Sequence, residues 1–354
     1  MNARRIRLTS LRHQHGLGLI EIMVALAISA VLLTGVIQIF LSSKLSYRVA
    51  DANARVQEGG RFAVNFITDD LRMAGYTGCF RGELTDPSKV ENVLNTPAAF
   101  SWDLGTPLAG HDGGAAGWSP ALPGELAGLV RAGTDVVITR GLDSSGIRLV
   151  PPFPAGGPGS AKFFVNEAGN NLNDADIVMV TDCRNGSIFQ ITNQQPAGGK
   201  VNVVHSSGCA ACVPGNTAPQ LGNRYGADAE IARLQTNIYY IGTNDAGEPA
   251  LFRMSLANNG ALQPMELIAG AEDMQVLYGE DADGDGVANR YARAHEVTME
   301  NVVSVRYSLL LRSEDNITGE PQVYLYNGEE QTAADRRLRR VFGSTVKLRN
   351  RGLL

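Results

Sequence analysis

Residues 17–41 read LGLIEIMVALAISAVLLTGVIQIFL, and Glu21 is the one charged side chain in these 25 residues. Coiled as an α-helix, the stretch is about 37 Å long and exceeds the ~30 Å hydrocarbon layer of a bilayer. Residues 1–16 before it contain four arginines and no acidic residue, and no comparable basic cluster follows it. Because basic flanks remain in the cytoplasm, we expect a single membrane-spanning helix that leaves the rest of the chain outside the inner membrane. A cleaved secretory peptide is the alternative, but its apolar region is usually shorter.

The charge of the chain is unevenly distributed. The 354 residues include 31 Lys+Arg and 36 Asp+Glu, for a net charge of −5. Without the four arginines of residues 1–16, 27 basic residues face 36 acidic ones, so the remainder carries −9. This acidic balance argues against a broad basic surface for nucleic acid, and we expect no nucleic-acid partner. A short basic segment before an acidic body is typical of a targeting segment.

Glu21 lies only four residues into the apolar stretch. A carboxylate at the centre of a membrane helix costs about 2.5–3.5 kcal/mol, and less near the interface. A cost of this size indicates a partner for the carboxylate. If the chain is cut between Gly16 and Leu17, the new amine of one subunit can pair with Glu21 of a neighbour. The alternative is an interfacial glutamate whose side chain reaches water.

The sequence HGLGLIE at residues 15–21, followed by an uninterrupted apolar helix, resembles the processing site of type IV prepilins. The resemblance implies that a prepilin peptidase cleaves after Gly16 and that Leu17 becomes an N-methylated amino terminus. It also implies that Glu21 is the carboxylate used in assembly. Two positions depart from the usual pattern. The first mature residue is usually Phe and is Leu17 here, and the second is usually Thr or Ser and is Gly18.

Residues 42–75 show apolar side chains every three or four positions, which predicts an amphipathic helix that continues the membrane helix as one rod. The adjacent glycines Gly59 and Gly60 predict a kink or weak point, since each costs about 1 kcal/mol relative to alanine. We expect the helix to end near Gly75 and to pack one face on a globular domain formed by residues 76–354.

The rest of the chain predicts short strands joined by long loops. Residues 76–133 are rich in Gly, Pro, Ala and Ser without a sustained period, and residues 81–130 are a possible insertion. Runs rich in β-branched and aromatic residues predict strands at 135–140, 147–150, 162–165, 176–181, 187–192, 201–205, 236–242, 250–254, 274–278, 302–312 and 344–348. The segment 244–248 (NDAGE) predicts a hairpin turn. One long helix followed by strands without βα alternation indicates an α+β fold with an antiparallel sheet.

Five segments, in chain order, resemble the PilW family of minor pilins: QEGGRFA at 57–63, DLRMAGY at 70–76, SIFQ at 187–190, EDMQV at 272–276 and TVKLRNR at 345–351. The resemblance implies a type IV pilin-like fold, with a single-pass inner-membrane helix and a β-rich periplasmic domain. It further implies that the chain joins other minor pilins in a complex that primes pilus assembly, near the filament tip, and enters the pilus after assembly. Two other functions remain open. One is a type II secretion pseudopilin, and the other is a membrane-tethered calcium-binding or adhesive module outside any filament.

Four cysteines would face an oxidising compartment, where disulfides form: Cys79, Cys183, Cys209 and Cys212. Four cysteines allow three pairings. We favour Cys79–Cys183, which would join the end of the long helix to the sheet, together with a local Cys209–Cys212 bridge. A redox Cys-x-x-Cys motif and a zinc site are the alternatives. The first lacks a following helix in the pattern, and the second lacks another close pair of cysteines.

The segment DADGDGVAN at residues 281–289 has the oxygen-ligand spacing of an EF-hand calcium loop. The candidate ligands are Asp281, Asp283, Asp285, the carbonyl of Val287 and Asn289. Position 12, normally a bidentate glutamate, is Ala292, so the loop alone is an incomplete site. A solvated acidic turn between strands is the alternative. Calcium is therefore a possible ligand, and no other cofactor is predicted.

The sequence contains no recognisable catalytic motif. Its five histidines are scattered, and neither a Gly-x-Ser-x-Gly, a His-Glu-x-x-His nor a phosphate loop occurs. The basic run DRRLRR at residues 335–340 predicts a solvated or ion-paired face rather than a DNA groove. We therefore expect a non-enzymatic protein.

Overall fold

The computed structural model describes residues 18–153, 162–209, 212–257 and 259–351. The chain divides into two compact units, residues 1–51 and 52–354. Helix α1 runs from Leu19 to Met73 and contributes to both units, and all described strands belong to the second unit.

The described part of the first unit contains an apolar stretch of α1 whose large side chains are exposed. An 18-residue window of α1 has a mean hydropathy of 2.5, and none of it is buried. Large side chains such as Leu19, Val31 and Ile39 are at least 70% exposed. Burying a side chain of this size away from water is worth about 1.5–3 kcal/mol. The segment therefore has the length and composition of a helix that lies in an apolar environment, as a membrane anchor does.

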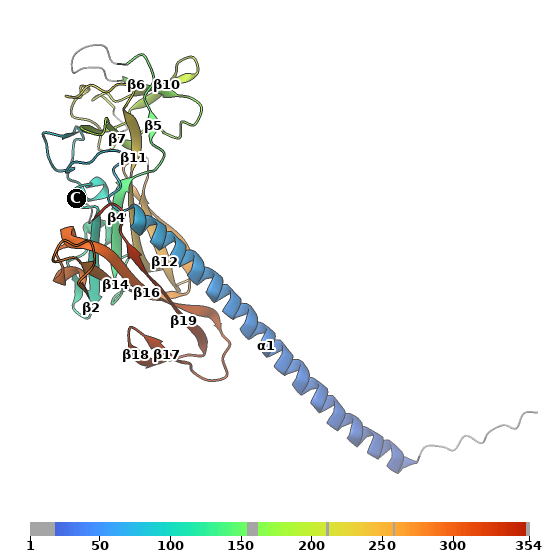
Figure 1. Cartoon of the computed structure of the whole chain (residues 1–354). Helices are drawn as coiled ribbons and strands as arrows, with labels where there is room; N and C mark the ends of the chain where they lie inside the picture. The colour runs from blue at the N-terminus through green and yellow to red at the C-terminus, as the bar shows by residue number, and fades with distance from the viewer. Residues whose placement is uncertain (1–17, 154–161, 210–211, 258, 352–354) are drawn as a thin grey trace, which may run out of the picture. The chain divides into compact units, whose positions relative to one another are not determined.

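The second unit contains four sheets in its described part (Figure 1). The main sheet has ten strands in the order β1-β8-β7-β11-β4-β2-β3, with β5 and β12 paired to β11 and β13 paired to β12. Its strands are β1 (Val90–Asn92), β2 (Leu108–Gly114), β3 (Gly117–Ser119), β4 (Val136–Leu142), β5 (Ile147–Arg148), β7 (Ile177–Thr181), β8 (Gly186–Gln190), β11 (Glu230–Thr243), β12 (Pro249–Leu256) and β13 (Leu262–Ala269). All its pairs are antiparallel except β1 with β8, as the sequence predicted for the fold.

The other three sheets are smaller. A four-stranded sheet has the order β15-β14-β16-β19, formed by Arg290–Ala292, Ala271–Glu280, Val302–Asn316 and Arg337–Lys347. A three-stranded sheet comprises β6 (Lys162–Asn166), β10 (Lys200–Val204) and β9 (Asn193–Pro196), and a hairpin comprises β17 (Val323–Tyr326) and β18 (Glu329–Thr332). Four short 3-10 helices complete the described elements: η1 (Phe100–Trp102), η2 (Gly124–Leu126), η3 (Ala294–Glu296) and η4 (Met299–Asn301).

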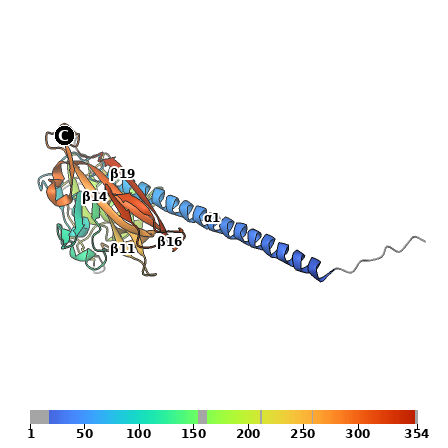
Figure 2. The ribbon, with the colours of Figure 1, turned by 90° about the horizontal axis from the view of Figure 1, so that it is seen from below.

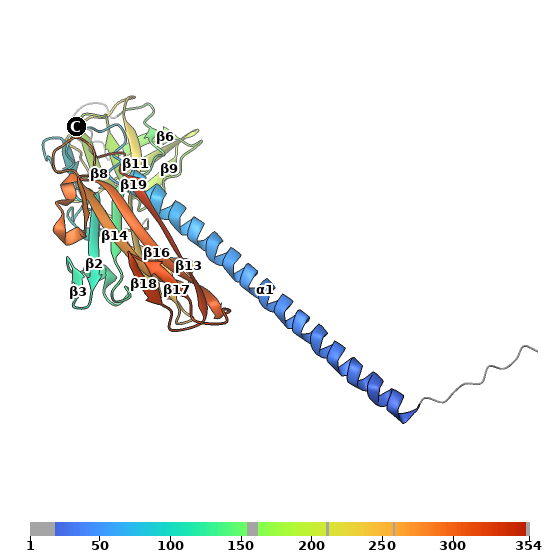
Figure 3. The same ribbon diagram turned by 60° about the horizontal axis from the view of Figure 1, so that its bottom comes forward.

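The second half of α1 packs into the core between the ten-stranded and four-stranded sheets. Its buried side chains include Val56, Ala63, Ile67 and Leu71, spaced so that they fall on one face of the helix. They join a cluster of buried residues from β11, β12, β14, β16 and β19. Figures 2 and 3 show β14, β16 and β19 side by side in the smaller sheet. The predicted class, one long helix on an antiparallel β domain, is confirmed.

Gly59 and Gly60 do not interrupt α1, so the predicted kink is wrong. α1 is continuous from Leu19 to Met73. A Cβ at Gly60 would lie 2.4 Å from the ring of Phe342 in β19, and a Cβ at Gly59 would lie 3.1 Å from Ile268 in β13. The glycines therefore allow the helix to approach both sheets closely, and this packing offsets their poor helix propensity.

The strand pattern differs from the prediction mainly where glycine, proline or charge weakens the signal. β2 lies within residues 76–133, which were expected to form long loops with isolated short elements, and it pairs with β4 and buries Leu108 completely. β13 was not predicted because Pro264 interrupts its pattern. β11 extends from Glu230 to Thr243, about twice the predicted length. β1, β3, β9, β15, β17 and β18 are short strands that were also not predicted.

Candidate functional site

Glu21 lies in the first turn of α1, where its carboxylate accepts the backbone N–H of Gly18 at 3.1 Å. The first N–H groups of a helix lack intrahelical partners, so an acidic side chain here satisfies one donor and complements the helix dipole. The side chain is exposed and can reach a group of another molecule. Gly16 and Leu17, the predicted cleavage site, lie outside the described residues, and their roles stay predictions.

Two tyrosines hold the second half of α1 on the sheets. The hydroxyl of Tyr307 in β16 donates to the carbonyl of Val64 at 3.0 Å and lies 2.9 Å from the hydroxyl of Thr68. The hydroxyl of Tyr239 in β11 lies 3.1 Å from the carbonyl of Phe66. Because one tyrosine comes from each main sheet, the helix is fixed to both by hydrogen bonds as well as by its apolar face.

The Tyr239 hydroxyl also donates to the carboxylate of Asp70 at 2.5 Å, and the guanidinium of Arg253 lies 3.7 Å from the same carboxylate. Burial raises the pKa of Asp70, and the contacts with Tyr239 and Arg253 counteract this only in part. Burial beside this carboxylate also raises the pKa of Tyr239. The sequence placed Asp70 in the helix pattern and in the segment DLRMAGY, and did not predict these contacts.

Within the second unit, α1 carries two partly exposed aromatic side chains. Phe62 is 50% exposed and Phe66 is 41% exposed, one helical turn apart. The guanidinium of Arg253 lies over the Phe66 ring, 5.7 Å from its centroid. This pair of rings is an apolar surface that another helix or strand can cover.

Both favoured disulfides are present in the structure. Cys79 is joined to Cys183 across 104 residues, and Cys209 is joined to Cys212 across three. The first bridge connects the segment that follows α1 with the turn between β7 and β8. No described cysteine is free. This arrangement is the one expected for structural bridges, not for a zinc site built from all four thiolates.

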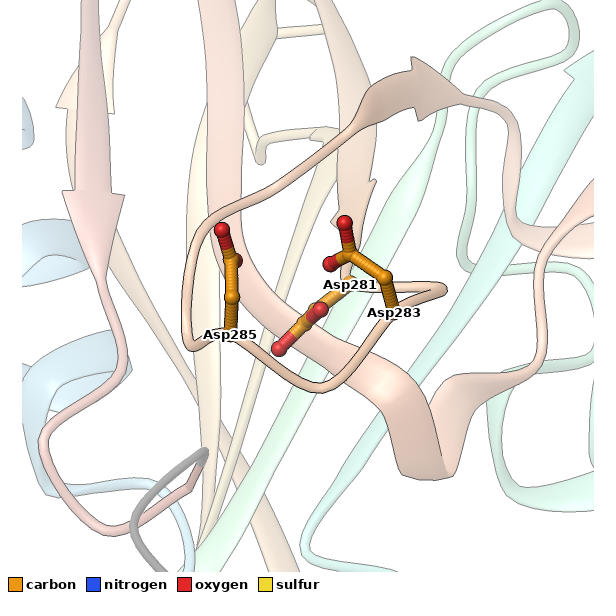
Figure 4. Close-up of side chains that lie close together, drawn as sticks. All are labelled: Asp281, Asp283 and Asp285. Atoms are coloured by element: carbon orange, nitrogen blue, oxygen red, sulfur yellow. The ribbon is translucent and has the colours of Figure 1, made fainter.

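The acidic segment forms the loop that joins β14 to β15, and Figure 4 shows its three aspartates. One carboxylate oxygen from each of Asp281, Asp283 and Asp285 lies within 4.8 Å of the others. Asp281 accepts the backbone N–H groups of Gly284 at 2.7 Å and Gly286 at 2.8 Å. Although burial opposes ionisation of this group, these bonds lower the pKa of Asp281 overall. The sequence spacing therefore brings the three carboxylates together.

Asn289, a predicted ligand, and Ala292, at the position where the sequence lacks one, do not complete the site. Asn289 donates its side-chain amide to Asp283 at 3.2 Å, and its amide oxygen accepts the N–H of Ala282 at 2.6 Å. Ala292, at the position of the missing glutamate, pairs with Tyr278 in the hairpin and offers no carboxylate. The nearby Glu280 accepts the N–H of Thr298 and the Arg290 side chain, which lowers its pKa and keeps it engaged. The loop thus brings together three carboxylates, but position 12 supplies no carboxylate.

Asp335, Arg337 and Arg339 of the basic run at residues 335–340 belong to an ion-pair network, which agrees with the predicted ion-paired face. The network consists of Arg312, Arg337, Arg339, Glu248, Glu272 and Asp335. Arg339 reaches Glu272 at 2.7 Å and Asp335 at 2.6 Å. Hydrogen bonds from Arg337 and Arg312 lower the pKa of Glu248 to about 2. Three cations and three anions balance, so this segment supports the β14–β16–β19 sheet.

A second cluster of polar groups was missed because its members are far apart in the sequence. The Asp135 carboxylate accepts the backbone N–H groups of Gly113 at 2.8 Å and Val276 at 2.7 Å, and thereby joins the ten-stranded to the four-stranded sheet. Close to Asp135, the carboxylate of Asp112 accepts a hydrogen bond from the ring nitrogen Nδ1 of His295 at 2.7 Å. No local motif links residues 112, 135, 276 and 295, so only the fold brings them together.

Comparison with known families gives two matches to this chain. The family model described as Type IV Pilus-assembly protein W matches residues 238–350, which include Tyr239, Tyr307, Phe342 and the acidic loop. The model described as Prokaryotic N-terminal methylation motif matches residues 11–37, which include Gly16, Leu17 and Glu21.

Comparison with individual proteins gives weaker similarity than the family models do. No curated protein matches the sequence. Among solved structures, a type IV-like pilin from Thermus thermophilus is similar at 14% identity with a TM-score of 0.21, over 49% of this chain and 85% of that one. The amino-terminal methylation motif on an exposed apolar helix indicates membrane anchoring and association with a pilus. Together with this motif, the match over residues 238–350 makes the chain similar to the PilW family of type IV pilus-assembly proteins.

Proposed function

We propose that this protein is a minor pilin that helps to initiate type IV pilus assembly by docking with other minor pilins, near the filament tip. The observation that carries the proposal is the methylation motif at residues 11–37, which leads directly into a helix with an apolar, unburied window and Glu21 in its first turn. An apolar helix without protein around it requires lipid before assembly and other helices after it.

In this proposal a prepilin peptidase removes residues 1–16, Leu17 is N-methylated, and the helix remains in the inner membrane with the β domain in the periplasm. The four leader arginines support this orientation, because basic residues stay on the cytoplasmic side. Intact-mass measurement of the purified protein tests the processing step. We expect the mass of residues 17–354 plus one methyl group, and a mass that includes the leader would contradict it.

The proposed mechanism of docking is non-catalytic. The exposed Glu21 carboxylate pairs with the amino terminus of a neighbouring subunit, since an opposite charge offsets the cost of a carboxylate in an apolar layer. The exposed rings of Phe62 and Phe66 add an apolar surface on the same helix, farther from the membrane. The β domain then selects the neighbours.

The variant Glu21→Ala tests the docking step in the native host. We expect leader cleavage to proceed and surface piliation to fall, because the helix inserts but loses its charged partner. Gln38→Ala is the matched control, since it also removes a polar group from the apolar stretch, and it should leave piliation close to normal. Normal piliation in the Glu21→Ala strain would contradict the pairing.

We propose in addition that the 281–289 loop binds calcium weakly. The specific support is the approach of three carboxylate oxygens to within 4.8 Å, with Asp281 oriented by two backbone N–H groups. The residues that would hold the ion are Asp281, Asp283, Asp285, the carbonyl of Val287 and, through water, Asn289. Because position 12 lacks its carboxylate, we expect a Kd on the order of 10⁻⁴–10⁻³ M, as in extracellular modules.

Isothermal titration of the full chain in detergent micelles with calcium tests this loop. We expect saturable binding that the double variant Asp281→Ala/Asp283→Ala loses. Asp245→Ala, which removes an acidic side chain from the turn between β11 and β12, is the control and should bind as the wild type does. Equal binding by the double variant would exclude the loop as the site.

A further inference from the structure

A polar cleft opens where two strands that pair with the same edge of β11 diverge. The register of β7 with β11 ends at the pair Arg233 and Val178, and the register of β12 with β11 begins at the pair Asn237 and Ser255. Residues 234–236 pair with β4 on the other edge and belong to neither register. Figure 1 shows β7 and β12 near opposite ends of β11. The gap between the two strands accounts for a cleft of about 350 Å³.

The cleft lies on the side of the ten-stranded sheet that faces α1. Tyr239 of β11 points to this side, because its hydroxyl donates to Asp70 of α1. Side chains alternate along a strand, so Gln235 points to the same side, where it lines the cleft and is exposed. Thr236 points to the opposite side, since its hydroxyl donates to the carbonyl of Ser101 at 2.7 Å. The cleft is therefore bounded by one face of β11 and by the last turns of α1.

The two arginines that line the cleft are each balanced by a carboxylate of this chain. The guanidinium of Arg253 lies 3.7 Å from the carboxylate of Asp70. Arg233 donates its Nε–H to the carboxylate of Asp143 at 3.1 Å and its backbone N–H to the same group at 3.3 Å. These two pairs leave no net positive charge in the cleft, so an anion is not the expected ligand.

Asp176, the fourth charged residue of the lining, has no cation of its own. It is 5% exposed, and its Oδ2 accepts the backbone N–H of Asn173 at 2.7 Å. In the described part of the chain it forms no ion pair, because Arg233 is engaged by Asp143. Burial raises the pKa of Asp176, and the bond from Asn173 and the charge of Arg233 lower it only in part. A nearly buried carboxylate without a counter-ion is costly, so the cleft favours a cationic ligand.

The neutral groups of the lining indicate which cation fits. The side-chain oxygens of Ser255 and Asn237 lie beside each other, joined by a hydrogen bond of 2.7 Å, and can accept further donors. An ammonium group has three N–H donors for such oxygens and for a carboxylate. Ile177 and Leu256 also line the cleft and can contact an alkyl chain. This combination suits an ammonium group on an alkyl stem.

Other cations suit the cleft less well. A guanidinium binds a carboxylate best through two parallel hydrogen bonds, and Oδ2 of Asp176 already accepts from Asn173. Divalent metal ions usually require several carboxylate or carbonyl oxygens. Among the described residues, the acids placed closely enough to hold a metal ion are those of the 281–289 loop and not those of the cleft.

We propose that this cleft binds an alkylammonium group, carried by a free primary amine or by a lysine side chain of another protein. Asp176 supplies the opposite charge, Ser255 and Asn237 accept the remaining N–H groups, and Ile177 and Leu256 contact the alkyl stem. The inference does not depend on the pilus role, because it concerns binding by the folded β domain alone.

Saturation-transfer NMR with the full chain in nonionic detergent micelles tests the proposal. The probes are butylamine and N-acetyl-lysine methylamide, and their controls are butanol and N-acetyl-norleucine methylamide, which keep the alkyl chain without the ammonium group. We expect saturable binding of an amine and none of the controls. Binding of the blocked lysine would identify a protein side chain as a ligand, and binding of butylamine alone would identify a free amine. Failure of both amines to bind, or equal binding of the uncharged controls, would overturn the proposal.

The variant Asp176→Asn removes the charge and keeps an oxygen that can accept the N–H of Asn173. We expect amine affinity to fall about tenfold or more, as the loss of one hydrogen bond between charged groups does. Asp174→Asn is the matched control, because it removes an exposed aspartate two residues away that does not line the cleft. The control should bind amine as the wild type does. Unchanged affinity in Asp176→Asn, or an equal loss in both variants, would overturn the proposal.

A second substitution tests the cleft without altering a buried group. Gln235→Lys changes an exposed residue of the lining and adds an ammonium group that should compete with the amine and weaken its binding about tenfold. Gln235→Met, of similar length and without charge, is the control and should retain amine binding. Equal amine affinity in the folded Gln235→Lys and Gln235→Met proteins would also overturn the proposal.

Discussion

The ring of Phe342 in β19 lies directly against the backbone of Gly60 in α1, so that a Cβ at position 60 would be only 2.4 Å from the ring. Both residues belong to the core in which α1 meets the four-stranded sheet. The close approach depends on the absence of a side chain at position 60. Glycine at this position therefore contributes more to packing than it costs the helix.

We predict that Gly60→Ala destabilises the protein. Alanine would favour the helix by about 1 kcal/mol, but overpacking a core typically costs about 1–3 kcal/mol, and the aromatic ring has little freedom to move. We expect a net loss of about 1–2 kcal/mol in the free energy of unfolding, measured by denaturant titration in micelles. The double variant Gly60→Ala/Phe342→Leu should recover part of the loss. A Gly60→Ala protein as stable as the wild type would show that the helix does not approach β19 this closely.

The raised pKa of the buried Asp135 carboxyl predicts a specific pH dependence of stability. Burial raises its pKa to about 6, bonds from Val276 and Gly113 lower it, and the carboxylates of Asp112 and Asp273 raise it further. The folded-state pKa lies above the unfolded value of about 3.9. The contribution of protonated Asp135 to the free energy of unfolding is therefore fully present below pH ~4 and is lost as pH rises through about 6. A shift of this size corresponds to about 2–3 kcal/mol.

The variant Asp135→Asn should lose this titration. Unfolding free energies measured from pH 4 to pH 7 should show the wild type losing about 2–3 kcal/mol relative to the variant across this range. Asp245→Asn, in an exposed turn, is the control and should follow the wild-type curve. Parallel curves for wild type and Asp135→Asn would mean that this carboxylate titrates as it does in the unfolded chain.

The two disulfides should differ in their effect on stability. On the chain-entropy model the 104-residue separation of Cys79 and Cys183 corresponds to about 4–5 kcal/mol, and the three-residue separation of Cys209 and Cys212 to about 2 kcal/mol. Denaturant unfolding of Cys79→Ser/Cys183→Ser should therefore show the larger loss, with Cys209→Ser/Cys212→Ser as the matched comparison. A larger loss for the short bridge would contradict this ranking.

Local sequence patterns predict the parts of this protein that depend on local physics. The apolar run at residues 17–41 and the helical periodicity after it predict α1, and alternating β-branched runs predict β4, β7 and β16 close to their observed positions. The three aspartates of the 281–289 loop could also be placed together, because their spacing alone determines a tight turn.

Features that depend on tertiary packing were not predicted from the sequence. Glycine-rich β2 (LAGHDGG) has weak strand propensity and forms because β4 pairs with it. The Gly59–Gly60 pair predicts a helix break from the sequence alone, because the sequence does not show that the ring of Phe342, far along the chain, packs against Gly60. The Asp135 and Asp112–His295 contacts join residues from different sheets, and no spacing in the sequence reports them.

The central proposal, that this protein helps to initiate pilus assembly, is tested most directly by deleting its gene in the native host and restoring it from a plasmid. The measurement is the amount of pilin in the sheared surface fraction, with export of type II secretion substrates measured in the same strains. We predict that the deletion strain loses most surface pili and twitching motility, exports normally, and recovers on complementation. Normal piliation with lost export would contradict the account and identify the protein as a secretion pseudopilin.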